Sequence, residues 1–196
     1  HVAGFCFGHH NAGFKLVFIK MNDSNKHTIS VVSDVVCPWC YIGKNRLAKA
    51  LEILANEMPA TRSAVAVEWL PFELNPGLPP AGMDRRDYCR MKFGSLDYAN
   101  KLYANVADNA RADGLEINLG NISVTPNSRQ AHRLIYFASK QSVADATVAE
   151  LFRAYFVNGE NIGDPQILVD LAVRVGLDRE STMDLLLADD DSGEFQ

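Results

Sequence analysis

The sequence has little cysteine, no long apolar run and no cluster of positive charge. Its 196 residues include only four cysteines, too few and too unevenly spaced for a secreted scaffold held together by disulfides. No segment approaches the roughly 20 consecutive apolar residues of a membrane-spanning helix. Lysine and arginine are scattered along a chain of formal net charge -5, so we expect neither a nucleic acid nor a membrane as a partner. The length fits one ordinary domain, or one domain with a large insertion.

The first 27 residues do not have the pattern of a targeting signal. Their short apolar patches are interrupted by residues 8–11, and no basic segment precedes a continuous apolar stretch. We therefore predict a cytoplasmic protein whose residues 1–27 form an extension that is disordered or non-native. A metal site built from Cys6, His9 and His10 is an alternative, but such terminal segments are commonly disordered, and we predict no metal ligands.

The motif Cys37-Pro38-Trp39-Cys40 places two thiols one helical turn apart. This spacing has two common uses, as half of a zinc site or as a reversible dithiol. Upstream, the β-branched run at 29–32 predicts a buried strand, and downstream an apolar stripe predicts an amphipathic helix over residues 38–56. The sequence contains no second Cys-x-x-Cys and no His-x-x-x-His pattern, which favours the redox use.

The predicted start of this helix gives the two thiols different roles. Cys37 falls near the N-cap, and Pro38 occupies the first helical position, where its missing N–H costs nothing. Because unpaired N–H groups and the helix dipole favour a thiolate there, Cys37 is predicted to be the acidic, attacking cysteine at the exposed end of the helix. Cys40 lies seven residues before Leu47 on the apolar stripe and is predicted to be the shielded, resolving thiol. Pro38 and Trp39 carry no charge and are predicted to shape the approach of a partner disulfide.

The rest of the chain predicts a second strand followed by helices. Alternating apolar residues at 65–70 complete a right-handed βαβ unit with parallel strands, which puts the dithiol at the carboxyl end of the first strand. The proline-rich stretch 71–80 marks a boundary, and the pattern beyond it is almost purely helical. Within these helices Cys89 is predicted to be a packed residue. His132 is either a half-buried helix histidine or a polar group that faces the dithiol and the substrate.

Several segments around the dithiol resemble one known family. They are residues 33–44 (SDVVCPWCYIGK), 69–76 (WLPFELNP), 131–134 (AHRL) and 151–156 (LFRAYF). In order, over about residues 28–188, they are similar to the FrnE-like branch of the DsbA family. The resemblance implies an α/β, thioredoxin-like fold with a large helical insertion after the second strand. It also implies a dithiol oxidoreductase or disulfide isomerase with Cys37 as nucleophile and Cys40 as resolving thiol.

The sequence departs from this family at its end. The family continues after its helices with two more strands and a helix, and a cis-proline preceded by valine opens the first of those strands. Residues 177–196 contain no Val-Pro pair and no two alternating apolar strands, so we expect the C-terminal strands to be missing and the chain to be a fragment. The resulting two-stranded parallel sheet would have an uncovered apolar face and unpaired edges.

The expected division of the chain follows from these patterns. It consists of the extension over 1–27, the first half (βαβ) of the thioredoxin-like domain over 28–76, the helical insertion over 77–176, and the last helix with a truncated return to the thioredoxin-like domain over 177–196.

The preferred function is thiol–disulfide exchange through Cys37 and Cys40, acting on disulfide-containing proteins or small thiols without a cofactor. One alternative is a glutathione-dependent isomerase or transferase of the kappa type, which looks similar in its helical insertion. Those enzymes use a single serine or cysteine at the first position, so Cys40 argues against them. A zinc-binding module without enzymatic activity and a redox-sensing chaperone are further alternatives. Neither the direction of exchange nor the oligomeric state follows from the sequence.

Overall fold

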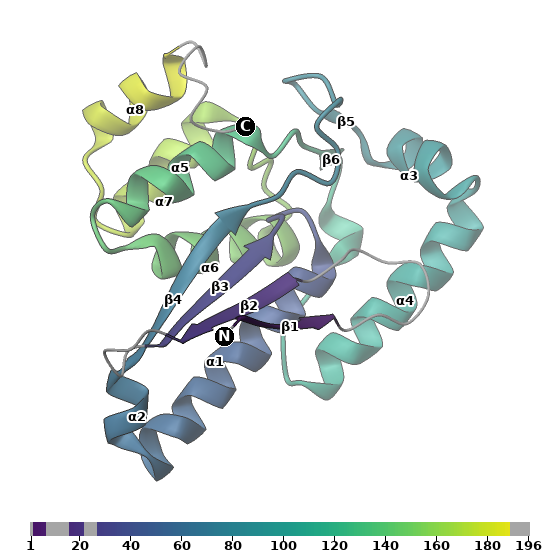
Figure 1. The fold of residues 1–196 in the computed structure, drawn as a ribbon. Coiled ribbons are helices and arrows are strands. Elements are labelled where there is room, and N and C mark those ends of the chain that lie inside the picture. The colour runs from purple at the N-terminus through teal and green to yellow at the C-terminus, as the bar shows by residue number, and fades with distance from the viewer. Residues whose placement is uncertain (1, 7–15, 22–26, 189–196) are drawn as a thin grey trace.

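The computed structural model describes the backbone of residues 2–6, 16–21 and 27–188, and the side chains of residues 27–188. A four-stranded sheet lies at its centre, with helices on both sides (Figure 1). The strands follow the order β1-β2-β3-β4 and comprise Val2–Cys6, Leu16–Met21, His27–Ser33 and Val65–Pro71. β3 and β4 run parallel, with Val31 opposite Trp69, whereas β2 is antiparallel to β1 and to β3. The parallel pair confirms the predicted βαβ unit.

The start of the chain differs from the two-stranded sheet expected from the sequence. Val2–Cys6 and Leu16–Met21 form paired strands rather than disordered segments, and the sheet therefore has four strands. A non-native origin of residues 1–27 stays a prediction. β2 contains the run Leu-Val-Phe-Ile, whose β-branched and aromatic residues favour a strand once β3 offers an edge to pair with. The side chains of Cys6, His9 and His10 lie outside the described residues.

Helix α1 (Pro38–Glu57) connects β3 to β4 and begins where the sequence predicts. Cys37 is its N-cap in an extended conformation, with φ -91° and ψ 114°, and Pro38 occupies the first turn. After α1 the chain forms the short helix α2 (Pro59–Ser63). Its N-terminal proline favours this helix, because proline is preorganised for the first position of a helix.

Beyond β4 the chain is helical, as predicted, apart from the short pair of β5 (Met83–Asp84) with β6 (Val124–Thr125). The helices are α3 (Arg85–Phe93), α4 (Leu96–Ala112), the 3-10 turn η1 (Leu119–Asn121), α5 (Arg129–Ser139), α6 (Ala144–Arg153), the π-helical η2 (Ala154–Asn158), α7 (Pro165–Arg174) and α8 (Arg179–Leu187). Side-chain oxygens that accept a first-turn N–H cap α3, α4, α7 and α8. In the described part of the chain, no helix combines the length and the apolar character needed to cross a bilayer.

The main core joins the start of α1 to the helices beyond the sheet. Tyr41, the residue after Cys40, stacks on Phe152 and Phe156 with ring centroids 5.3 and 5.5 Å away. Both phenylalanines are fully buried. This aromatic packing fixes the first turn of α1, and with it the dithiol, against α6 and η2.

We expect Phe152→Ala to lower the free energy of unfolding by about 3–5 kcal/mol, because it removes a fully buried ring and leaves a cavity. Urea unfolding followed by circular dichroism measures the change. The control is Phe72→Ala, whose ring is 43% exposed and whose loss should cost within about 0.5 kcal/mol. Equal losses in the two variants would contradict the assignment of Phe152 to the core.

Candidate active site

Cys37 and Cys40 lie on the first turn of α1, where the chain leaves the carboxyl end of β3. The N–H of Cys37 donates to the carbonyl of Asp34 at 3.0 Å. The N–H groups of Cys40 and Tyr41 donate to the carbonyl of Cys37 at 3.0 and 3.2 Å. Among the described residues, Cys37, Cys40 and Cys89 form no disulfide. The backbone bonds therefore fix a turn that holds the two thiols close to each other.

The pKa of the Cys37 thiol is held below its usual range. The largest cause is a hydrogen bond from the Cys40 thiol, and the backbone N–H groups of Cys40 and Trp39 act in the same direction. Each donor stabilises the thiolate relative to the thiol. Burial and the negative charge of Asp34 raise the pKa and only partly offset these hydrogen bonds. An acidic Cys37 is predicted from the helix end alone; the structure adds the Cys40 thiol as the largest contribution.

Cys37 is not at an exposed position, which corrects one prediction. The exposed fraction is 4% for Cys37 and 5% for Cys40, so burial does not distinguish the two thiols. Both belong to the main buried cluster, together with Trp69 and the aromatic residues of α6 and η2. Helical periodicity predicts the side of α1 on which a residue lies, but not that distant helices pack over the start of α1. A partner disulfide must therefore reach a residue of which only 4% is exposed.

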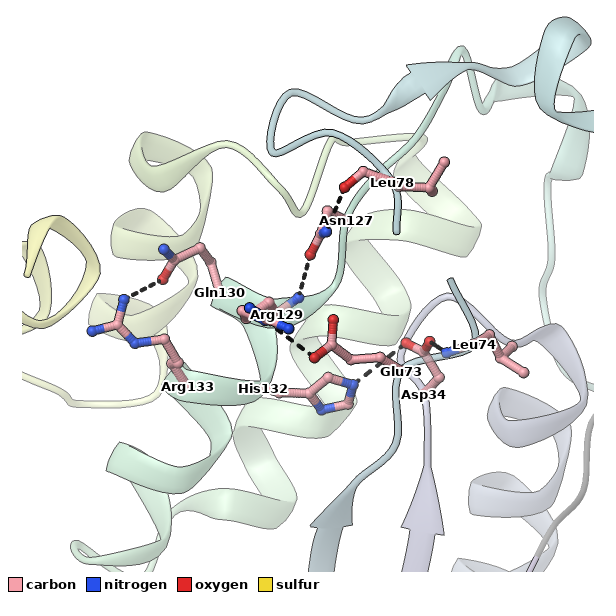
Figure 2. A network of polar contacts seen from close by, with 9 residues as sticks. All are labelled: Asp34, Glu73, Leu74, Leu78, Asn127, Arg129, Gln130, His132 and Arg133. Atoms are coloured by element: carbon pink, nitrogen blue, oxygen red, sulfur yellow. Dashed lines mark hydrogen bonds and ion pairs between the residues drawn. The ribbon is translucent and has the colours of Figure 1, made fainter. Parts of the chain in front are cut away.

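Asp34, which is not predicted as a site residue, contacts several polar groups next to the dithiol. Its carboxylate accepts the N–H of Leu74 at 2.7 Å and the N–H of Val36 at 3.2 Å. The oxygen Oδ1 also lies 3.5 Å from Nε2 of His132 on α5 (Figure 2). The available signal in the sequence is a carboxylate directly after a buried strand and three residues before Cys37.

His132 is fully buried, with 5% exposed, rather than half-buried. Its Nε2 atom has no hydrogen-bond partner among the described residues, and the 3.5 Å to Asp34 is an ion-pair distance. Asp34 is also the charged group that raises the pKa of Cys37. His132 therefore lies beside the carboxylate that acts on Cys37, and its role toward the substrate stays a prediction.

The same polar network holds the proline-rich segment that follows β4. Glu73 forms an ion pair with Arg129 at 3.2 Å, and the side chain of Asn127 donates to the carbonyl of Leu78 at 2.8 Å (Figure 2). With the bond from Leu74 to Asp34, these contacts attach the segment both to the start of α1 and to the start of α5. The dithiol and the helices that cover it are thus joined through this segment.

The remaining residues singled out in the sequence are Cys89, possible metal ligands, and Pro38 and Trp39. Cys89 is buried in a separate cluster with Tyr88 and Ala99, which confirms that it is a packed residue. Within the side chains of residues 27–188, no three His, Cys, Asp or Glu residues are grouped so that they would hold a metal ion. Pro38 lies in the first turn of α1 as predicted, and Trp39 is half-buried between two apolar clusters.

Comparisons with known proteins agree with this arrangement. The family model for the DSBA-like thioredoxin domain matches residues 28–195. An uncharacterized protein of Bacillus subtilis (strain 168), YwbO, is 32% identical over 156 residues, which cover 78% of this chain and 68% of that protein. The crystal structure of a probable DsbA oxidoreductase from Streptomyces coelicolor matches with a TM-score of 0.72 and 30% identity, over 82% of this chain and 68% of that one. A cytosolic disulfide reductase from Pseudomonas aeruginosa, DsbM, shares the fold at 18% identity and a TM-score of 0.55, over 81% and 68% of the two chains.

We expect Cys40→Ala to raise the pKa of Cys37, because the variant loses the hydrogen bond that lowers it most. The rate of alkylation by iodoacetamide, measured against pH, reports this pKa, and a Cys37→Ser variant supplies the background from the other cysteines. An unchanged titration would show that the Cys40 thiol does not stabilise the thiolate.

We expect Asp34→Asn to shift the pKa of Cys37 further down, because a negative charge that disfavours the thiolate is removed. The matched control is Glu73→Gln, which neutralises another carboxylate of the same polar network and should leave this titration in place. If the two variants behave alike, the effect of Asp34 comes from loosening of the network rather than from its charge.

Proposed function

Because the chain belongs to the DSBA-like thioredoxin domain family, we propose that it is a thiol–disulfide oxidoreductase or isomerase acting through Cys37 and Cys40. The observation that carries the assignment to these residues is the lowered pKa of Cys37 beside the Cys40 thiol, at the N-cap of α1. A thiolate is the attacking species in disulfide exchange, and a second thiol one turn away is placed to finish the reaction.

The reaction runs in two exchanges. The Cys37 thiolate attacks one sulfur of the substrate disulfide, forming a mixed disulfide and expelling the other sulfur as a thiolate. Cys40, deprotonated, then attacks the sulfur of Cys37, which forms the Cys37–Cys40 disulfide and releases the second substrate sulfur. The substrate gains two electrons and two protons, and the dithiol loses them. The reverse sequence oxidises a substrate dithiol. If a different substrate thiolate attacks the mixed disulfide before Cys40 does, a new substrate disulfide forms and the Cys37 thiolate is returned, which rearranges the substrate without net oxidation.

Opposing influences on Cys37 set its redox preference. Hydrogen bonds from Cys40 and Trp39 stabilise the thiolate, and a stabilised reduced form makes a dithiol a stronger oxidant. Burial and the charge of Asp34 act against this. We place the protein in the cytoplasm, where thiols are kept reduced. Its substrates there are disulfide-containing proteins or small thiols.

The contact between the two thiols also bears on the alternative of a glutathione-dependent isomerase. Such an enzyme needs only one reactive side chain at the first position, whereas here the Cys40 thiol makes the largest contribution to the acidity of Cys37. Trp39 is half-buried beside the dithiol, and we assign it and Pro38 the role of shaping the approach of the substrate. The finer placement in the FrnE-like branch rests on the sequence resemblance.

Insulin reduction in the presence of dithiothreitol tests the proposed function. Cys37→Ser should reduce the rate to that of the reaction without protein. Cys40→Ser should retain the first attack and accumulate mixed disulfides, seen by mass spectrometry. Cys89→Ser is the control, because its thiol is packed in a separate cluster, and it should retain activity. Equal rates in all variants, or stoichiometric zinc bound by protein prepared without chelator, would reject the redox assignment.

A further inference from the structure

We propose that the cleft beside β4 binds an extended segment of the polypeptide that carries the disulfide, adding it to the sheet as a strand. This inference rests on the proposed function, since it names the substrate class of the same dithiol. The cleft has a volume of about 730 Å³, within the range of about 300–1,000 Å³ found for ligand sites. One wall is the continuous run Val67–Pro71 of β4, and the other is formed by α5 and by residues 142–148 at the start of α6. Figure 1 shows β4 as the outermost strand on this side of the sheet.

Alternate backbone groups of β4 point into the cleft. In the parallel pair, the N–H of His27 donates to the carbonyl of Ala64 at 2.8 Å, which places the even-numbered residues of β4 toward β3. Val67 and Trp69 therefore direct their N–H and C=O groups away from β3, along an edge where no described strand pairs. These donors and acceptors repeat at the spacing of an extended chain. They match a polypeptide backbone in a way that a compact small molecule does not require.

The cleft extends to Ser33 at the carboxyl end of β3, from which the chain turns to the dithiol, and His132 also lines it. Ser33 precedes Asp34, whose carbonyl accepts the N–H of Cys37 at 3.0 Å, and His132 faces the carboxylate of Asp34 at 3.5 Å. Because a strand advances about 3.3 Å per residue, a segment paired with β4 lies only a few residues from the reacting sulfur. Pro71 has no N–H, so main-chain pairing stops there and the substrate cysteine is released from the strand to turn toward Cys37.

The lining of the cleft indicates which segments fit. Ile135 and Val148 supply apolar surface for the side chains of an added strand. The acidic side chains are Glu68 and Asp145, and the described lining contains no lysine or arginine. Lys44, which lies outside this lining, pairs with Asp145 at 3.6 Å, so Glu68 is the carboxylate that disfavours acidic segments. The cleft therefore suits an extended segment with small apolar and basic side chains.

Hydrogen exchange on a trapped complex tests this proposal. In the Cys40→Ser variant, Cys37 attacks the cysteine sulfur of a short peptide of alanine, valine and lysine activated with thionitrobenzoate. This forms the Cys37–peptide disulfide and expels the thionitrobenzoate anion. Exchange of the Val67 and Trp69 amides, followed by nuclear magnetic resonance, should slow by about tenfold or more. The amides of even-numbered residues, already bonded to β3, should change little. The control is the same variant carrying mercaptoethanol on Cys37, which has no backbone to pair.

Each other outcome has a defined meaning. If the peptide is trapped and the Val67 and Trp69 amides exchange as they do in the mercaptoethanol adduct, strand addition is wrong while the dithiol function stands. If no mixed disulfide forms with either reagent, the proposed function fails, and this inference fails with it. If these amides are protected without peptide and the protection grows with protein concentration, the occupant is a second copy of the chain, which overturns the proposal.

A substitution in the strand gives a second, kinetic test. Val67→Pro removes the outward N–H and leaves the bonds to β3 in place, because an edge position tolerates proline. The ratio of the trapping rate with peptide to that with mercaptoethanol disulfide should fall about tenfold, the loss of roughly 1.4 kcal/mol expected for one main-chain hydrogen bond. Val67→Ala keeps the N–H and should keep this ratio near that of the parent. Equal ratios in the two variants would contradict pairing at Val67.

Discussion

The buried carboxylate of Asp34 connects the sheet, the dithiol and the covering helices. Asp34 directly follows β3, and its carboxylate accepts the N–H groups of Val36 and Leu74 and faces His132 of α5. A carboxylate that is 1% exposed is costly to fold unless donors replace its lost water, so these contacts are a condition of the fold. They also determine geometry: one donor lies in the turn into α1, one in the segment after β4, and the histidine lies on a helix from the second half of the chain. The dithiol turn is thereby held at the point where three parts of the chain meet.

The chemistry of Cys37 depends on a balance around this carboxylate. Asp34 and burial disfavour a charged sulfur, while the Cys40 thiol and two backbone N–H groups favour it, and the favourable contacts prevail. A thiolate in a buried position has few waters to stabilise it, so each donor matters more than at a surface. The dithiol is therefore sensitive to changes in residues that never touch a substrate sulfur.

Local rules account for what the sequence predicts correctly. Pro38 at the start of α1 is a signal that depends only on adjacent residues, and α1 begins where it is predicted to begin. The burial of Cys37 is different, because it belongs to a cluster that includes Phe156 and other residues far along the chain. The importance of Asp34 is equally nonlocal, since a carboxylate after a strand resembles an ordinary turn residue until distant donors are placed. β1 and β2 are a different case, because each pairs with its neighbour along the chain, and the run Leu-Val-Phe-Ile of β2 is itself a local signal for a strand.

The proline-rich segment after β4 has a consequence for motion. Loops that link two structural units often act as hinges, which requires backbone angles free to change. Here Leu74 is bonded to Asp34 after β3, whereas Glu73 and Leu78 contact Arg129 and Asn127 at the start of α5. Prolines at 76, 79 and 80 further restrict the backbone of the segment. The segment therefore links the sheet to α5 without acting as a hinge. These contacts hold the start of α5 in a fixed position relative to the end of β3, where the turn to the dithiol begins, rather than leaving the helices free to swing.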